Sequence, residues 1–393
     1  MKCISCNYST KDLIDFGNHY KCSDFFKKSI EKKSFKRKNL SIIICKECNL
    51  LQLKKPIFYK DITPKFKWMK NKEEDNYHFD YIKLLLKKKK LKKNLKILGM
   101  SVYDTTLLTY LKFFGYKNSK LFNINNDLRI KNKNAEKQEV IQNFLNKKNA
   151  ELFSKKNGKY DLIVCSKLLE HSQNIKKVLD FLNIVLHDKG YLIIDVPDST
   201  KSLSQGNISM IWEEHISYFT ANTLKNVAYQ NGFKVILQKR YPFKQEDNLI
   251  YLMEKKRSNS LTKLKDYTKP MVFKKQIYLH LIKLKKILKD LKDRQFKVAI
   301  YGGGHNSVAF INLYNIGQYI DCIVDDDKRK SNLFSIESNL PVKKLKDLNK
   351  KFKFAFFLGT SISSEEKIKK KLKEIKKSKI FSIFPDSKLF YNK

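Results

Sequence analysis

Long hydrophobic runs are absent from this sequence of 393 residues. No window of 18 or more residues is both apolar and free of charged side chains, so we expect no membrane-spanning helix and no membrane partner. The chain begins MKCISCNYST, without the apolar core of a secretory signal. We therefore predict a cytoplasmic location.

Arginine is scarce as well, although the chain is strongly basic. Only six of its 82 Lys and Arg residues are arginine, and the formal net charge is +43. A basic chain can bind nucleic acid by neutralising phosphates, but phosphate and base recognition favour the forked guanidinium group of arginine. Lysine instead occupies nearly every position expected to face solvent. A compositional bias therefore explains the charge better than a nucleic-acid partner, which is the less favoured alternative.

The composition is that of a folded protein, with 42% hydrophobic and 12% aromatic residues. At roughly 100–200 residues per domain, the length predicts two or three domains. Apolar strands are expected at 95–100, 120–125, 160–166, 191–197, 297–304, 320–327, 352–359 and 379–385. Helices are expected at 77–93, 105–115, 174–190, 260–294, 308–317 and 365–375. This alternation predicts an α/β fold with parallel, doubly wound sheets.

Two CxxC pairs lie in the first 60 residues, Cys3 with Cys6 and Cys45 with Cys48. Their four thiolates match the number and geometry that tetrahedral Zn²⁺ requires, and both pairs precede an asparagine that suits a tight turn. Because four protein ligands leave no open coordination position, the metal would be structural. Free thiols or a redox-active CxxC are the alternatives.

The remaining cysteines are weaker candidates for metal binding. Cys22 and His19 lie between the two CxxC pairs and are less favoured ligands. Cys165 and Cys322 fall within expected strands, where cysteine packs as a small hydrophobic residue.

A glycine turn ends the strand expected at 297–304. Gly302 and Gly304 precede His305 and the next expected helix, which is the setting of a phosphate-binding turn. Asp325, near the end of the following strand, is where a dinucleotide-binding domain would hold a ribose. NAD(P) binding and a turn needed only for close packing are both open at this point.

The order of these features resembles the three-domain sugar C-methyltransferases, which depend on S-adenosylmethionine (SAM) and act on nucleotide-linked 4-keto deoxysugars. The segments that carry the resemblance are ICKECNLLQL (44–53), EEHISYF (213–219), AIYGGG (299–304) and CIVDDD (322–327). The resemblance runs from Cys3 to about Phe384. It implies a zinc-binding domain at 1–60, a class I methyltransferase-like domain at 61–258 and, led by a bridging helix, a Rossmann-like C-methyltransferase domain at 259–393.

The resemblance also implies a mechanism. A general base removes a proton beside the ketone, and the resulting enolate takes the methyl group of SAM. Matching the motifs residue by residue gives His215 as the base, Glu214 as the group that orients it, and His171 near the reacting centre. The substrate contacts implied in the same way are Trp212, Ser217, Tyr218, Gly302, Gly304 and His305. Trp212 and Glu213 stand where the family has tyrosine and histidine.

The SAM-binding loop departs from the family's pattern. The family has glycines at the first strand-to-helix turn, whereas this chain reads GMSVYD at 99–104. Val102 and Tyr103 disfavour the positive φ angles that such loops often use. The cofactor-binding residues that the resemblance implies are Ser101, Asp104, Asn125, Asp127 and Leu168. An active methyltransferase is the favoured hypothesis, and a weakened or inactive relative that binds a nucleotide-sugar or a partner is the alternative.

Overall fold

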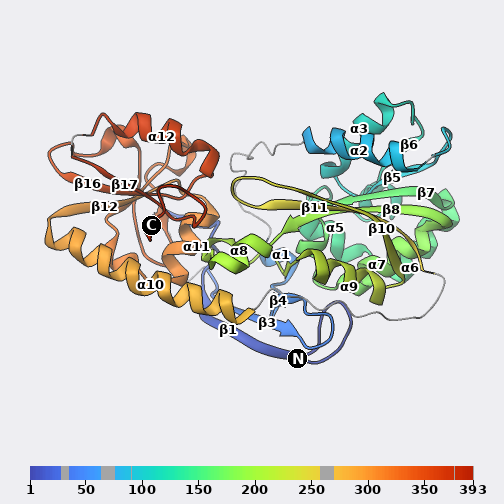
Figure 1. Cartoon of the computed structure of the whole chain (residues 1–393), viewed down its shortest axis with the longest axis horizontal. Coiled ribbons are helices and arrows are strands. Elements are labelled where there is room, and N and C mark those ends of the chain that lie inside the picture. Colours follow the sequence, from blue (N-terminus) through green and yellow to red (C-terminus); the bar gives the residue numbers. More distant parts are fainter. Residues whose placement is uncertain (28–34, 63–75, 90, 257–269, 376, 393) are drawn as a thin grey trace.

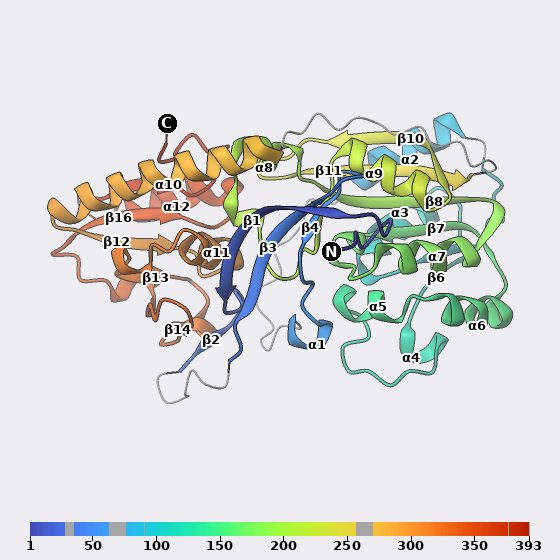
Figure 2. The same cartoon turned by 90° about the horizontal axis from the view of Figure 1, so that it is seen from below.

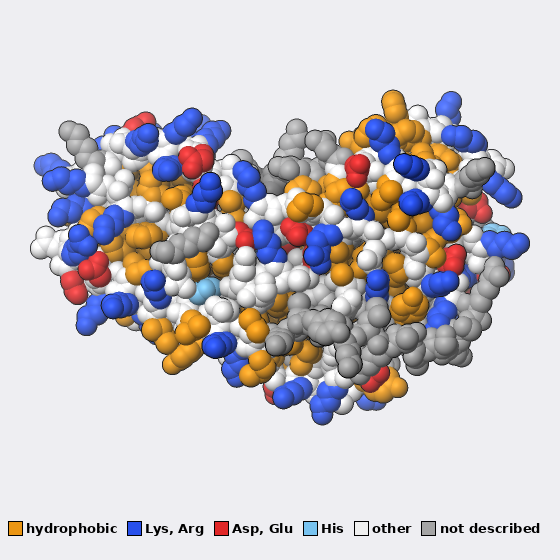
Figure 3. All heavy atoms as spheres, in the orientation of Figure 1, with side chains coloured by type: hydrophobic (Ala, Val, Ile, Leu, Met, Phe, Trp, Pro, Cys, Tyr) orange, Lys and Arg blue, Asp and Glu red, His pale blue; other side chains and the backbone are white. Residues whose placement is uncertain are grey.

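The computed structural model describes residues 1–27, 35–62, 76–89, 91–256, 270–375 and 377–392. Two α/β units lie side by side, and a small β unit from the N-terminus lies between and below them (Figure 1). Among the described helices, none combines the length and apolar character needed to cross a bilayer. Lys and Arg side chains are spread over the whole visible face (Figure 3), so they form no single basic stripe there.

The N-terminal unit is built on an antiparallel sheet with the strand order β1-β3-β4-β9. Its strands are β1 (Thr10–His19), β3 (Lys38–Cys45), β4 (Leu51–Leu53) and β9 (Ser217–Tyr218). The last strand belongs to a much later part of the chain. The unit also reaches the C-terminal unit, because β2 (Phe25–Phe26) pairs with β14 (Phe334–Ser335). Figure 2 shows β1 and β3 crossing between the two α/β units.

The central unit contains a six-stranded sheet with the order β10-β11-β8-β7-β5-β6. Four strands are parallel: β6 (Ser119–Leu121), β5 (Ile97–Gly99), β7 (Tyr160–Ser166) and β8 (Leu186–Asp198). The hairpin of β10 (Phe233–Tyr241) and β11 (Asp247–Lys255) adds two strands, of which β11 pairs antiparallel to β8.

Helices cover both faces of the central sheet. On one face lie α2 (Asn76–Lys88) and α3 (Thr105–Phe113). On the other lie α5 (Gln138–Phe144), α6 (Lys147–Asn157), α7 (Ile175–Val185) and α9 (Ala221–Gln230). Each helix packs a buried apolar stripe against the strands, which is how amphipathic helices complete a doubly wound sheet. Figure 1 shows the two groups of helices on opposite sides of the sheet.

The C-terminal unit has a fully parallel sheet with the order β15-β13-β12-β16-β17. The strands are β12 (Phe296–Tyr301), β13 (Cys322–Val324), β15 (Val342–Lys343), β16 (Lys353–Leu358) and β17 (Lys379–Ser382). The long helix α10 (Pro270–Asp293) and α11 (His305–Leu313) cover one face, and α12 (Glu365–Leu372) covers the other. The predicted α/β class with doubly wound sheets is confirmed.

Short helices complete the chain: α1 (Tyr59–Ile62), α4 (Ile124–Asp127) and α8 (Thr200–Gln205). Seven single turns of 3-10 helix lie outside them in the described part of the chain, and three matter for the site: η2 (Val102–Asp104), η3 (Leu169–His171) and η4 (Ile208–Met210). The predicted long helix at 260–294 is described from Pro270 onward, and its first ten residues lie outside the described part of the chain.

Two local predictions were wrong. The helix expected at 174–190 ends at Val185, because Gly190 lies inside β8, where an added Cβ would meet Leu186 at 2.8 Å and a β7 carbonyl at 3.0 Å. The strand expected at 120–125 ends at Leu121, because the Asn123 side chain accepts two backbone N–H bonds and caps α4. The hairpin of β10 and β11 was not predicted at all.

Candidate functional site

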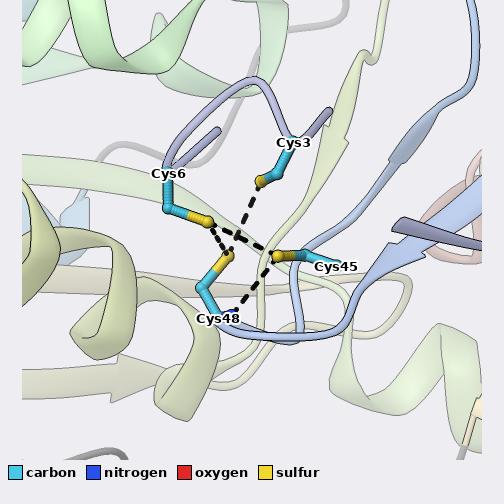
Figure 4. A group of neighbouring side chains, drawn as sticks. All are labelled: Cys3, Cys6, Cys45 and Cys48. Carbon is cyan, nitrogen blue, oxygen red and sulfur yellow. Dashed lines mark hydrogen bonds between the residues drawn. The ribbon is translucent and has the colours of Figure 1, made fainter. Parts of the chain in front are cut away.

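Four cysteines form a compact cluster in the N-terminal unit. The sulfurs of Cys3, Cys6, Cys45 and Cys48 all lie within 4.8 Å of one another (Figure 4). Cys3 Sγ lies 3.7 Å from Cys48 Sγ, and Cys6 Sγ lies 3.4 Å from Cys45 Sγ and 3.8 Å from Cys48 Sγ. Four thiolates around a tetrahedral zinc, each about 2.3 Å from the ion, lie about 3.8 Å apart. The residues present therefore fit a zinc ion.

Local backbone geometry explains why the two CxxC pairs converge. Asn7 and Asn49, which follow the pairs, have φ angles of 61° each, so both turns use the left-handed conformation that asparagine tolerates. Backbone N–H groups donate to the sulfurs, from Ser5 to Cys3 and from Glu47 to Cys45. Such donors stabilise thiolates and are typical of cysteine-bound metal sites.

The other candidate ligands lie elsewhere. His19 contacts the carbonyl oxygen of Phe16, and the backbone N–H of Cys22 donates to the Glu213 carboxylate at 2.7 Å. Neither side chain belongs to the described cysteine cluster. Cys165 and Cys322 are buried in strands, as expected.

The N-terminal sheet holds the segment that carries His215. Strand β9 begins two residues after His215, where Ser217 pairs with Gln52 and Tyr218 pairs with Leu51 of β4. Both β9 residues are buried, so they fix this segment in place and do not face an open site. On the opposite side, the backbone N–H of Ile216 donates to the carbonyl oxygen of Glu170 in η3, at 2.7 Å. Backbone hydrogen bonds thus hold the segment to both the N-terminal unit and the central unit.

Four rings form a continuous cluster where the three units meet. The His171 and His215 ring centroids lie 5.0 Å apart, and those of His215 and Trp212 lie 5.1 Å apart. Trp212 in turn stacks on His305, at 3.9 Å and 18°. His171 comes from η3 of the central unit and His305 begins α11 of the C-terminal unit. The structure therefore brings together four of the residues predicted for the catalytic and substrate sites.

The environment of the cluster keeps two of its histidines, His215 and His305, neutral. Burial lowers the pKa of His215 well below its usual range, and the neighbouring charges of His171, His305 and Lys167 lower it further. Burial also lowers the pKa of His305 to about 4. A neutral imidazole has a free lone pair, so His215 can accept a proton at neutral pH.

Glu214 was expected to orient His215, but the carboxylates around the ring cluster have a different arrangement. Burial, and then the charges of Glu139 and Glu213, raise the pKa of Glu214 well above its usual range. Within the described residues, no hydrogen bond joins its carboxylate to His215; its backbone carbonyl instead faces His171 Nδ1 at 3.0 Å. The Glu139 carboxylate on α5 lies 3.4 Å from His171 Nδ1. No motif flagged Glu139, because only the packing of α5 brings it here.

The loop after β5 forms without any positive φ angle. Ser101 has an extended backbone and caps η2, where its Oγ accepts a hydrogen bond from the N–H of Tyr103 at 3.2 Å. The side chains of Val102 and Tyr103 point outward and are 45% and 41% exposed. The loop therefore needs none of the positive φ angles that Val102 and Tyr103 disfavour, because a right-handed single turn replaces the glycine loop. Gly99 alone needs to be glycine, since an added Cβ would meet Leu108 at 2.8 Å.

Asp104 faces inward and holds this loop together. Its carboxylate accepts hydrogen bonds from the backbone N–H groups of Met100, Ser101 and Ser166 at 2.7–2.9 Å. It thereby ties the end of β5 to the end of β7. Burial raises the pKa of Asp104 to about 7, although these donors oppose the shift. Asp104 is buried with no exposed surface, so its side chain supports the loop and does not face a ligand.

The remaining predicted cofactor residues have structural partners. Asn125 is exposed, and its side chain exchanges two hydrogen bonds with the backbone of Asn132. Asp127 is buried, and accepts from the N–H of Asn123 at 2.8 Å and from Lys120. Leu168 lies in the core with its side chain fully buried. The structure does not bring these three side chains together around one open site.

The glycine turn of the C-terminal unit is closed internally. Gly302 has a φ angle of 102° and leaves no room for a Cβ beside Thr360, whereas Gly304 is exposed and precedes α11. The Asp325 carboxylate accepts from the N–H of Gly303 at 2.6 Å and from Lys330 Nζ at 3.0 Å. A carboxylate engaged in this way does not favour the ribose contact of an NAD(P) site.

Comparisons with known proteins agree with this architecture. A family model described as a methyltransferase domain matches residues 72–238, and one described as a C-methyltransferase C-terminal domain matches 232–385. The second match begins within the central sheet, and the division at residues 60 and 258 stays a prediction. Comparison with curated protein sequences found no match. The alternative of an inactive relative is not favoured by the two domain matches.

Solved structures give weaker likenesses. A 1,6-didemethyltoxoflavin-N1-methyltransferase of Burkholderia thailandensis is 10% identical with a TM-score of 0.29, over 46% of this chain and 77% of that one. An S-adenosylmethionine-dependent methyltransferase of Clostridium acetobutylicum is 13% identical with a TM-score of 0.31, over 47% and 93%. The N-methyltransferase NodS of Bradyrhizobium japonicum is 10% identical with a TM-score of 0.29, over 47% and 97%.

Values this low carry no argument about chemistry, so the assignment rests on the two domain matches. They cover the central and C-terminal units, whose doubly wound sheets the structure describes. The chain is a SAM-dependent methyltransferase that carries a C-methyltransferase C-terminal domain.

Proposed function

We propose that the protein transfers a methyl group from SAM to a carbon beside the ketone of a nucleotide-linked keto-sugar. The observation that carries the proposal is His215, held neutral by burial at the junction of the three units. A proton beside a ketone is weakly acidic, so its removal needs a base that is unprotonated at working pH and fixed in place. The resemblance of EEHISYF (213–219) to the sugar C-methyltransferases supports the choice of acceptor.

In this reaction His215 accepts the proton from the substrate carbon. Its ring is positioned by the backbone hydrogen bond of Ile216 and by the rings of His171 and Trp212. The Glu139 carboxylate beside His171 Nδ1 places negative charge next to the pair of histidine rings in which an imidazolium would form. SAM, when bound, supplies the electrophilic methyl group. We place it beside the loop at Ser101–Asp104, at the carboxyl end of β5, where doubly wound sheets bind ligands.

We further propose that Zn²⁺ binds the four cysteines and acts structurally. The sulfur spacing and the N–H donors support this role. The zinc lies at one end of the sheet that includes β9, so it stabilises the segment carrying His215 without contacting substrate.

The test measures methyl transfer from labelled SAM to dTDP-4-keto-6-deoxyglucose, and deuterium uptake beside the ketone without SAM. Deuterium uptake reports the base alone. We expect His215→Gln to lower both rates by about 10²–10⁴-fold with the fold intact, because it removes the general base. His187→Gln is the matched control, since His187 is exposed on β8.

An absence of methyl transfer and of deuterium uptake by the wild-type protein would refute the keto-sugar acceptor. Uptake that survives in His215→Gln would assign the base to another residue.

A further inference from the structure

Lys167 lies beside the ring cluster in a backbone conformation that is unusual for lysine. It directly follows the last residue of β7, and its φ angle is 53°. This left-handed region is strained for a residue with a long side chain, and such strain often marks functional sites. The residue is only 9% exposed. The fold therefore holds a buried ammonium group close to the carboxyl ends of β7 and β8.

Two neighbouring strands supply the partners of Lys167. Its backbone N–H donates to the carbonyl oxygen of Asp195 on β8 at 2.8 Å, and its Nζ donates to the side-chain oxygen of Asn248 on β11. The Asp195 carboxylate accepts hydrogen bonds from Tyr77 Oη and His78 Nε2, each at 2.8 Å. Burial acts to raise the pKa of Asp195, but the charge of Lys167 and the bonds from His78 and Tyr77 outweigh it and lower the pKa.

Lys167 is also close to the proposed base. It lies four residues before His171 and just before η3, and the His171 ring lies 5.0 Å from that of His215. The pKa of His215 is lowered first by burial, then by His171 and His305, and then by the charge of Lys167. A cation and a neutral base therefore share one buried region.

We propose that Lys167 donates a hydrogen bond to the ketone oxygen of the substrate and stabilises the negative charge that develops there. The inference rests on the proposed function. When His215 takes the proton, the C–H electron pair forms a carbon–carbon double bond and the carbonyl π pair moves onto the oxygen. The enolate then forms a bond to the methyl carbon of SAM, the sulfur–methyl bond breaks, and the carbonyl is restored. The proton on His215 passes to water.

The charge of the ammonium group suits this role. In a buried region, a fixed cation stabilises a developing oxyanion more strongly than it could in water, because little solvent screens it. Asn248 and Asp195 are positioning residues here, since they act through Lys167. Without such a cation, the buried environment that keeps His215 unprotonated would also disfavour the enolate.

The test uses Lys167→Met in the full chain, with dTDP-4-keto-6-deoxyglucose as the probe. We expect deuterium uptake beside the ketone and methyl transfer to fall by about 10²–10³-fold, the loss typical of removing one oxyanion donor. Substrate KM, zinc content and melting temperature are measured alongside. Lys189→Met, which removes an exposed lysine from β8, should match the wild type.

A second variant separates catalysis from charge balance. Lys167→Met leaves the buried Asp195 without its cation, and Asp195→Asn in the same chain removes that imbalance. If Lys167 only neutralises Asp195, the double variant regains the wild-type rate, which would overturn the inference. A rate still reduced at least 100-fold in a folded double variant supports it.

The two proposals fail in different ways. An active wild-type protein with a Lys167→Met variant within threefold of its rate would overturn the role of Lys167 alone. A wild-type protein that neither exchanges nor methylates the probe would overturn the proposed function and this inference with it.

Discussion

The indole of Trp212 stacks on the imidazole of His305, with ring centroids 3.9 Å apart and planes 18° from parallel. Trp212 belongs to the segment between η4 and β9, whereas His305 is the first residue of α11. The pair therefore joins the C-terminal unit to the segment that carries His215. Because His305 is held neutral by burial, the contact is a ring stack and not a cation–π pair at neutral pH.

Replacing Trp212 should loosen this junction. We expect Trp212→Leu to lower the free energy of unfolding by about 1 kcal/mol through the lost stacking, and to raise the substrate KM more than it lowers kcat. Trp212→Phe keeps an aromatic ring and should stay closer to the wild type. Steady-state kinetics with urea unfolding measure both effects, and an unchanged KM in Trp212→Leu would place the substrate elsewhere.

Acid should inactivate the enzyme only well below the usual range of histidine. Burial lowers the pKa of His215, so the base stays unprotonated as the pH falls through 6.5. The acid limb of kcat/KM for deuterium uptake should therefore lie below pH 6.5. A pH profile that titrates at 6.5 or higher would contradict the environment described for this ring.

The free energy of unfolding should fall as the pH drops from about 6.5 to about 4. The pKa of His305 is about 4 when folded and about 6.5 when unfolded, so only the unfolded chain gains a proton as the pH drops between these values. Folding stability is thus intact above pH 6.5 and falls by on the order of 3 kcal/mol down to about pH 4. Urea unfolding of His305→Asn should show a flatter profile, and His187→Asn should not.

Loss of the proposed zinc ion should abolish activity, although the ion does not contact His215. β9 pairs with β4, so the N-terminal sheet connects the two cysteine turns to the segment that carries His215. We expect metal analysis to find one zinc per chain, and Cys48→Ser or strong chelation to lower the melting temperature and abolish methyl transfer. Cys22→Ser is the matched control. Full activity of a zinc-free, folded protein would break the proposed link.

Two substitutions in the loop after β5 should affect folding stability and SAM binding separately. Asp104→Ala leaves three backbone N–H groups without their acceptor and should cost about 3 kcal/mol or more of folding stability. Tyr103→Ala removes an exposed ring and should leave stability within about 0.5 kcal/mol while changing the affinity for SAM. Thermal unfolding and calorimetric SAM titration measure the two effects. Equal SAM affinity in Tyr103→Ala and wild type would move the cofactor away from this loop.

The amino-acid sequence determined the local features whose cause is local. Apolar periodicity predicted the parallel strands other than β15 and the helices α2, α3, α7, α10, α11 and α12, since burial of one face fixes the period. The CxxC spacing predicted the cysteine cluster, because a tight turn brings both sulfurs of a pair to one side. Prediction from the sequence failed at Gly190, where a close strand contact decided the structure, and at Asn123, whose side chain caps α4.

Only the tertiary structure decided which side chains meet. Glu139 and Lys167 lie beside the histidines because α5 and the end of β7 pack there, and no motif marks either residue. Asp104 matched a cofactor motif, yet it turns inward because the N–H groups of β5 and β7 need an acceptor. Burial and neighbouring charge set the protonation of a side chain, and both arise from distant parts of the chain. The sequence therefore supplied the reactive residues, and the packing of three units assigned them their roles.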